Sequence, residues 1–263
     1  MDTRFSRTLG SGAAVTTYTL SFWCKRTSFG AYQRFFMSAG TGDVYFRFTN
    51  TETIELSAGG GDQGYLITNR LFRDVGAWYH IVVRYDSTES SANDRFRLYV
   101  NGEDQRDFGG YSTDTMPGSS QTDNINLSGN TMRVGGDVSG QYFGGCMSHM
   151  HLCIGYSYAP TVFGEVDSTS GIWKIIADPS VSYGTNGFFM KMEDRTNLDL
   201  DSSPNANVFT SAGSPTATYD TPSNNFATLN SDAQDVAATY VITNANTTVQ
   251  SSSGWWTMPL TLG

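Results

Sequence analysis

Two runs rich in β-branched and aromatic residues, 78–86 and 95–100, constrain the fold more than any other part of the chain. They flank a loop of Ser, Thr, Glu, Asn and Asp, which is typical of paired strands. In the second run apolar and polar side chains alternate, as a strand with one buried face requires. The run ends in Asn101-Gly102, a dipeptide suited to the positive φ angles of a tight turn. The segment therefore predicts an antiparallel strand pair.

Similar strand-like runs recur at short intervals along the first part of the chain, and Gly, Asn, Asp and Ser separate them. They lie at 18–26, 34–39, 44–49, 53–57, 65–72, 124–127, 131–134 and 142–154. No segment before residue 158 has the 3.6-residue period of an amphipathic helix. The chain is therefore expected to be all-β, with an antiparallel β-sandwich of the jelly-roll type.

The local composition of the sequence predicts three regions. Residues 1–200 are expected to form the β-sandwich, and residues 201–236, dense in Ser, Asn, Asp and Pro, a polar linker. Residues 237–263 contain strand-like pieces but are too few to bury a core of their own. This tail adds a strand to the sandwich or to a partner, or it begins a further domain.

The charge of the chain argues against two classes of partner. Its net charge is −9 at pH 7, so no basic footprint for nucleic acid is present at the level of the whole chain. No stretch approaches the roughly 20 apolar residues of a membrane span. The first residues lack the apolar core of a signal peptide, so synthesis in a cytoplasm without export by the general secretory route is expected.

The cysteines and histidines give weaker signals. Cys24, Cys146 and Cys153 are expected to be free thiols, and the odd separation of the last two predicts that they face opposite sides of a strand. His149 and His151 are two residues apart, a spacing that suits either a metal pair or the exposed face of a sheet, and the second is the expectation.

Three groups of segments carry a resemblance to a known family. They read Thr-Leu-Ser-Phe-Trp-Cys-Lys-Arg at 19–26, Trp-Tyr-His-Ile-Val-Val-Arg-Tyr-Asp at 78–86 with Leu-Tyr-Val-Asn-Gly at 98–102, and Met-Arg-Val-Gly-Gly at 132–136 with Phe-Gly-Gly-Cys-Met-Ser-His-Met-His at 143–151. These segments resemble core strands of concanavalin A-like lectin/glucanase domains, in the laminin G-like and pentraxin-like branch. Segments 162–174, 183–188 and 220–230 resemble bacteriophage structural proteins that carry this domain, especially those of marine phages.

The resemblance implies a non-enzymatic virion protein, of the tail fibre or adhesin type, whose lectin-like domain binds a host surface glycan. A capsid-decoration or structural module that acts through protein contacts is the alternative. The implied partners are other virion subunits and host cell-surface carbohydrate, with the chain as a homo-oligomer in a virion assembled in the host cytoplasm.

A polysaccharide hydrolase is a third functional hypothesis, because the glucanase branch cleaves glycosidic bonds with acidic residues that alternate on one strand. No strand here carries such a motif. Glu52 and Glu55 are three residues apart and would point to opposite faces. We therefore expect no enzyme activity.

Aromatic residues near loop or strand ends are the candidates for contact with a sugar ring, since pyranose rings stack on aromatic faces. These candidates are Tyr111, Tyr142, Tyr156, Tyr158 and Trp173. Laminin G-like and pentraxin-like domains often hold calcium in loop carboxylates, so the resemblance implies calcium as a cofactor, with Asp137 as the first candidate ligand and Asp94 as another. The alternative is that loop aspartates accept turn hydrogen bonds.

Overall fold

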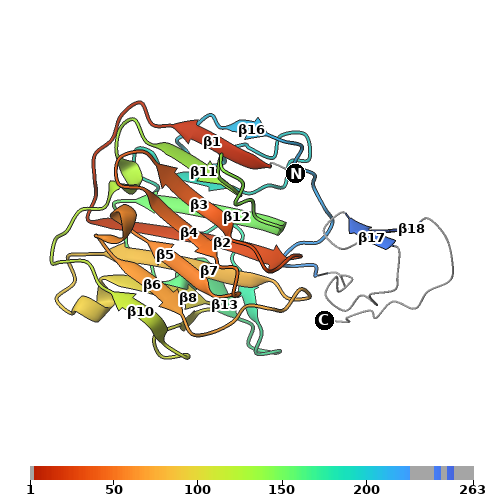
Figure 1. The fold of residues 1–263 in the computed structure, drawn as a ribbon, viewed down its shortest axis with the longest axis horizontal. Helices are drawn as coiled ribbons and strands as arrows, with labels where there is room; N and C mark the ends of the chain where they lie inside the picture. Colours follow the sequence, from red (N-terminus) through yellow and green to blue (C-terminus); the bar gives the residue numbers. More distant parts are fainter. Residues whose placement is uncertain (1–2, 226–239, 244–247, 252–263) are drawn as a thin grey trace.

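Two antiparallel sheets packed face to face form the body of the protein, as the sequence predicts (Figure 1). The computed structural model describes residues 3–225, 240–243 and 248–251. In spatial order the eight-stranded sheet contains β10 (Tyr111–Thr115), β6 (Tyr65–Thr68), β5 (Ile54–Ser57), β4 (Val44–Phe48), β3 (Gln33–Ala39), β11 (Thr131–Val134), β1 (Arg4–Thr8) and β16 (Thr210–Ala212). The six-stranded sheet contains β15 (Phe188–Met190), β12 (Gly145–Ile154), β2 (Thr17–Arg26), β7 (Tyr79–Asp86), β8 (Phe96–Val100) and β9 (Glu103–Asp104).

The remaining elements are short. Within the described residues, four 3₁₀ turns lie at Gly59–Gly61, Ala92–Asp94, Asn124–Asn126 and Pro160–Val162. Two further hairpins are formed by β13 (Gly164–Val166) with β14 (Trp173–Ile175), and by β17 (Tyr240–Thr243) with β18 (Thr248–Ser251). In the part of the chain that the structure describes, no helix is long and apolar enough to cross a membrane.

The hydrophobic core fills the space between the two sheets. The strand pair predicted from the sequence forms as β7 and β8, with Ile81 opposite Val100 and Val83 opposite Leu98. The inward side chains of β8 are fully buried, while its arginine points outward. Asn101 and Gly102 have φ angles of 52° and 82°, which confirms the predicted tight turn.

Gly102 lies under the ring of Trp173, and this contact leads to a prediction. A Cβ atom at Gly102 would lie 2.6 Å from the Trp173 ring. Gly102→Ala should therefore lower the free energy of unfolding by about 1–3 kcal/mol, through backbone strain and displacement of the indole. The matched control is Gly129→Ala, because Gly129 has a similar φ of +87° and its Cβ would meet nothing within 4 Å. Urea unfolding measures both variants, and equal losses would contradict the role of the ring contact.

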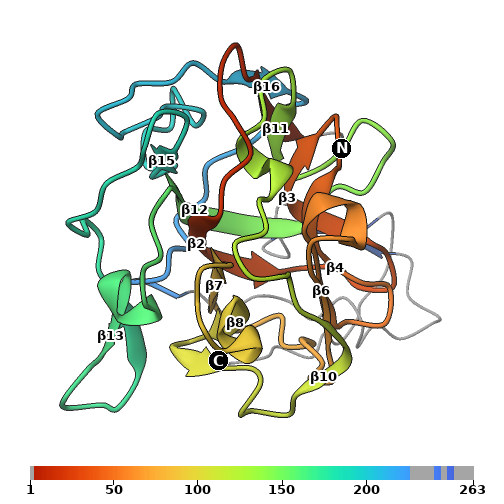
Figure 2. The ribbon, with the colours of Figure 1, turned by 90° about the vertical axis from the view of Figure 1, so that its left-hand side faces the viewer.

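The outer face of the six-stranded sheet is covered by the chain that follows β12. Figure 2 shows the β13–β14 hairpin on the side of this sheet that faces away from the eight-stranded sheet. His80 on this face is fully buried, and its Nδ1 accepts a hydrogen bond from Trp173 Nε1 at 2.9 Å. Its Nε2 then donates to Ser21 Oγ at 2.9 Å. Burial lowers the pKa of His80 to about 3, so the imidazole is neutral at physiological pH.

The expectation that His149 and His151 lie on an exposed face is wrong. Both are buried, because β15 pairs with β12 and brings the Phe189 ring to 3.8 Å from the His151 ring. The chain from residue 155 onward supplies a small second core on this side of the sheet, around Cys153, Phe163 and Tyr183. Sequence alternation alone does not reveal a covering layer that comes from a later part of the chain.

The prediction that Cys146 and Cys153 face opposite sides is also wrong, although all three thiols are free as expected. The pairing of β12 with β2 shifts register between Ser148 and His151. This β-bulge inserts one residue, so Cys146 and Cys153, opposite Lys25 and Thr19 respectively, share the outer face.

Part of the segment expected to be a linker contacts the sandwich. β16 pairs with β1 at the edge of the eight-stranded sheet. Further along, Asp220 forms an ion pair with buried Lys25 at 2.8 Å and accepts a hydrogen bond from Trp78 Nε1 at 2.8 Å. Residues 226–236 and the tail outside the β17–β18 hairpin lie outside the described residues.

Candidate functional site on the eight-stranded sheet

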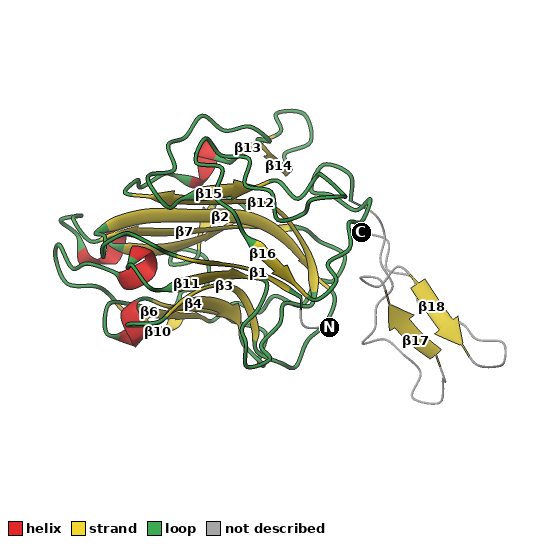
Figure 3. Cartoon of the chain, turned by 90° about the horizontal axis from the view of Figure 1, so that it is seen from above, coloured by secondary structure: helices red, strands yellow, loops and turns green. Residues whose placement is uncertain are grey.

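The outer face of the eight-stranded sheet presents polar and aromatic side chains that stay partly accessible. Figure 3 shows this sheet on the side of the sandwich opposite the β13–β14 hairpin. In β4 the residues Val44, Phe46 and Phe48 are buried in the core, so Tyr45 and Arg47 point outward. This face therefore differs from the covered outer face of the other sheet.

Glu55 organises the centre of the face. It is 2% exposed, and its Oε1 accepts hydrogen bonds from the hydroxyls of Tyr45 at 3.0 Å and Tyr65 at 2.9 Å. Arg47 donates to both carboxylate oxygens, from Nη2 at 2.8 Å and from Nε at 2.9 Å. Burial, followed by the charge of Glu55, raises the pKa of the Tyr45 hydroxyl, which stays protonated. The carboxylate thus fixes two tyrosine rings and one guanidinium group in place.

Rings and guanidinium groups alternate beside this carboxylate. The Arg47 guanidinium carbon lies 4.1 Å from the ring centroid of Tyr32 and 4.8 Å from that of Tyr45. The Arg34 guanidinium carbon lies 4.9 Å from the ring centroid of Tyr45, so Tyr45 has an arginine on each side. Such cation–π contacts hold the rings in place before a ligand arrives. Binding a ligand therefore costs little side-chain entropy. We call the six residues Tyr32, Arg34, Tyr45, Arg47, Glu55 and Tyr65 the tyrosine–arginine face.

A large groove continues from this face at one end of the sandwich. Its volume is about 1030 Å³, and its walls include Tyr32, Tyr142, His149 and Tyr219. Tyr32 belongs to both the groove and the tyrosine–arginine face, so the two form one continuous surface. Tyr32 is 39% exposed, which leaves much of its side chain open to solvent.

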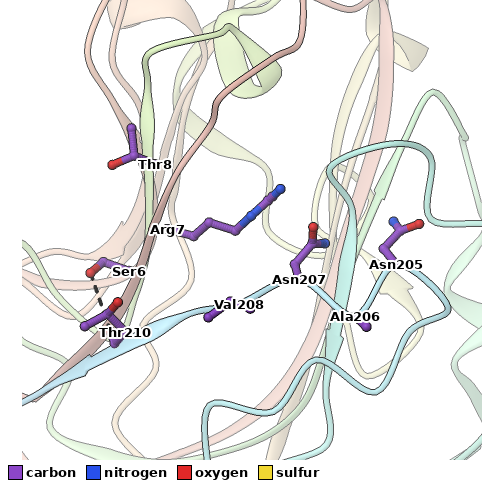
Figure 4. Close-up of a pocket in the computed structure, with 8 residues that line it drawn as sticks. All are labelled: Ser6, Arg7, Thr8, Asn205, Ala206, Asn207, Val208 and Thr210. Atoms are coloured by element: carbon purple, nitrogen blue, oxygen red, sulfur yellow. Dashed lines mark hydrogen bonds between the residues drawn. The ribbon is translucent and has the colours of Figure 1, made fainter.

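A second, smaller cavity of about 470 Å³ lies beside β1 and β16 (Figure 4). Arg7 points toward the 205–208 segment, and its Nη2 donates to Asn186 Oδ1 at 3.2 Å. Asn207 Nδ2 donates to the carbonyl of Gly187 at 2.8 Å. These bonds tie both β1 and the 205–208 segment to residues 186 and 187, which is a structural role.

The two predicted calcium ligands do not fit a calcium site. The Asp137 carboxylate accepts hydrogen bonds from Val138 N at 2.6 Å and Ser139 Oγ at 2.7 Å, and it pairs with Arg34 at 2.6 Å. Burial raises its pKa, but these hydrogen bonds and the arginine outweigh that effect and lower it overall. Asp94 lies in a 3₁₀ turn beside the other sheet and pairs with Arg97 at 3.4 Å. Among the described residues, no group of three or more His, Cys, Asp or Glu side chains could hold a metal ion.

The five predicted aromatic candidates do not form one site. Tyr142 lines the groove, whereas Tyr111 packs against the core at the edge strand β10. Tyr156 and Tyr158 stack on each other at 5.8 Å beyond the end of β12, and Trp173 covers His80. Of the five, only Tyr142 therefore lies on the surface that the structure singles out.

Sequence reasoning missed most of the tyrosine–arginine face, although a signal for it was present. The alternation in 44–48 that predicts an inward Val44, Phe46 and Phe48 also predicts an outward Tyr45 and Arg47. What the alternation does not reveal is that Glu55 and Tyr65 lie in register beside them.

Comparison with known proteins agrees with this architecture. Residues 7–162 match the concanavalin A-like lectin/glucanases superfamily, and the chain belongs to this family. A search of curated proteins found no match.

Several solved structures are similar to this chain at low sequence identity. A putative carbohydrate binding protein from Bacteroides ovatus is 16% identical with a TM-score of 0.53, and the match covers 84% of this chain and 59% of that one. A SAP-like pentraxin from Limulus polyphemus is 15% identical with a TM-score of 0.41, covering 60% and 72% of the two chains. The CBM40 domain of the Ruminococcus gnavus IT-sialidase is 16% identical with a TM-score of 0.37, covering 59% and 91%. At 16% identity the likeness to the Bacteroides ovatus protein shows the fold alone.

Proposed function

We propose that this protein is a non-enzymatic, carbohydrate-binding component of a phage virion, of the tail fibre or adhesin type, that attaches to a host surface glycan. The observation that carries the proposal is the tyrosine–arginine face, where Glu55 and Arg47 hold Tyr45 and Tyr65 on an accessible sheet surface. Membership of the lectin/glucanase superfamily supports carbohydrate as the ligand class.

The face has the two kinds of group that sugar binding needs. Aromatic rings such as Tyr32 stack on the apolar side of a pyranose ring, and guanidinium and amide groups donate hydrogen bonds to its hydroxyls. Gln141 supplies such an amide beside the face, because its Oε1 accepts a hydrogen bond from Arg47 Nη1 at 3.0 Å. Side chains already held in place lose little entropy when a ligand binds.

The state of the carboxylates supports binding without catalysis. A glycosidase needs two carboxyl groups, one of them a proton donor with a raised pKa. Glu55 is engaged by two tyrosine hydroxyls and an arginine, and the pKa of Asp137 is lowered. Asp137 is therefore not prepared to protonate a glycosidic oxygen, and the oxygens of Glu55 already accept hydrogen bonds within the face.

The virion assignment rests on the resemblance of segments 162–174, 183–188 and 220–230 to phage structural proteins. Other virion subunits and host carbohydrate are the proposed partners, with the chain as a homo-oligomer. The segment 162–174 contributes to the β13–β14 hairpin over the six-stranded sheet, which leaves the opposite sheet as the surface for recognition.

Tyr32→Ala tests this function directly. We expect the variant to bind its glycan about two- to tenfold more weakly, since one stacked ring contributes roughly 0.5–1.5 kcal/mol. The control is Tyr156→Ala, because Tyr156 has a similar exposure of 41% and lies on the other sheet's side. A glycan array and adsorption to host cells provide the readout. A folded wild-type protein that binds no glycan, or equal losses in both variants, would contradict the proposal.

A further inference from the structure

We infer that the outer face of the eight-stranded sheet selects acidic glycans, whose carboxylate or sulfate groups are bound by a row of arginines. The inference rests on the proposed glycan-binding function and specifies the class of sugar.

The row crosses four neighbouring strands. Arg4 lies on β1, Arg133 on β11, Arg34 on β3 and Arg47 on β4, and these strands are adjacent in the order β4-β3-β11-β1. Arg34 on β3 is directly opposite Arg47 on β4. Arg133 is opposite Met37 on β3 and, on its other side, Ser6 on β1. The core-facing neighbours Phe5, Met132 and Val134 show that Arg4 and Arg133 point outward.

Few negative charges offset this row. The strands β1, β3, β4, β5 and β11 contain one carboxylate, Glu55, and the loop after β11 adds Asp137. Four guanidinium charges against these two carboxylates leave an excess of two positive charges, on a chain whose net charge is −9. The positive face is therefore a local exception to the charge of the protein.

The two carboxylates already have partners within the face. Glu55 pairs with Arg47 at 2.8 Å and Asp137 with Arg34 at 2.6 Å, and both carboxylates are buried. Arg4 and Arg133 form no ion pair with any described residue. These two guanidinium groups are thus the ones left for an anionic ligand.

The chemistry of guanidinium groups defines the ligand. A planar guanidinium donates two parallel hydrogen bonds to a carboxylate or sulfate, and a sugar hydroxyl offers no such charged partner. An acidic polymer is repelled by most of this protein and attracted by the arginine row, so the charge distribution also orients its approach. Arg133, in the middle of the row, is the residue that we assign to specificity.

Matched pairs of polysaccharides test the inference. The probes are polygalacturonate and its methyl ester, hyaluronan and its carboxyl-reduced form, and chondroitin sulfate and its desulfated, carboxyl-reduced form. We expect the acidic member of at least one pair to bind about tenfold more tightly than its neutral partner, with an affinity that falls between about 50 and about 300 mM NaCl. Biolayer interferometry with the full chain measures both effects.

Variants assign the effect to the row. Arg133→Gln should weaken acidic binding by about fivefold or more while neutral binding changes by less than about twofold, because only the charge-assisted pair is lost. The control with the same charge change is Arg73→Gln, since Arg73 is exposed in the loop before β7. Equal binding of both members of every pair, or binding of neutral glycans alone, overturns the inference and leaves the proposed function standing. Binding of no glycan overturns both.

Discussion

Replacing Glu52 with alanine should lower the free energy of unfolding by about 3–5 kcal/mol, because it leaves a buried arginine without its counter-charge. Arg26 is fully buried, and its Nη2 lies 2.7 Å from Glu52 Oε2. The guanidinium is enclosed by the rings of Phe29 at 4.7 Å and Phe48 at 4.2 Å. Burial lowers the pKa of Arg26 and Glu52 raises it in part, so removal of Glu52 exposes the full cost of the buried charge.

Two further variants separate the ion pair from local backbone effects. Glu52 has a φ of 68°, and its Oε1 accepts a hydrogen bond from Gly30 N at 2.7 Å. Glu52→Gln keeps that acceptor and the same backbone cost, so it should be less destabilising than Glu52→Ala. The double variant Glu52→Ala with Arg26→Met should recover part of the loss, since no unpaired charge remains. Urea unfolding measures all three, and a loss below about 1 kcal/mol in Glu52→Ala would contradict the argument.

The same pair supports the binding surface. Gly30 lies two residues before Tyr32, and Glu52 holds the backbone of this loop. We therefore expect Glu52→Ala to weaken glycan binding even at temperatures where the protein remains folded.

The second large effect is a dependence of stability on pH that arises from Asp123. Asp123 is fully buried, and it accepts hydrogen bonds from Tyr18 OH at 2.8 Å and Ile125 N at 3.1 Å. Burial raises its pKa from 3.8 to about 7, and these hydrogen bonds offset only part of the shift. Between about pH 4 and pH 7 the folded protein thus keeps a proton that the unfolded chain releases. Its contribution to stability falls as the pH rises through this window, by up to about 1.4 kcal/mol per pH unit.

Asp123→Asn isolates this effect, because asparagine resembles the protonated acid and does not titrate. The buried His80 acts in the opposite sense, since its pKa is lowered to about 3 and the unfolded chain takes up a proton below about pH 6.5. The informative quantity is therefore the difference between variant and wild type, measured by urea unfolding from pH 4 to pH 8. This difference should shift in favour of the variant as the pH rises, and a difference that stays constant would contradict the prediction.

The sandwich itself was predictable from local patterns. Alternation in 78–86 and 95–100 specifies which side chains face the core, and the structure pairs these runs in the predicted antiparallel sense. Asn101-Gly102 predicts its own turn because few other dipeptides tolerate two consecutive positive φ angles. These features depend on residues that are close in sequence, so the order of residues within one strand or turn is enough to predict them.

The candidate site depends on contacts that no local pattern contains. Glu55 binds Arg47, Tyr45 and Tyr65 only because β4, β5 and β6 align in one register. The β-bulge in β12 likewise changes which side chains share a face, and its position follows from pairing with β2.

By itself, the sequence determined the all-β sandwich, its family and the inward face of the strands that alternate without a bulge, because period-two alternation is a property of neighbouring residues. The tertiary structure alone decided which outer face is available for binding. Residues far along the chain cover one sheet, where His80, His149 and His151 are buried, and leave the other with its tyrosines and arginines accessible. A strand's sequence reports that one face is buried, but whether the opposite face meets solvent or a later segment depends on packing between distant parts of the chain.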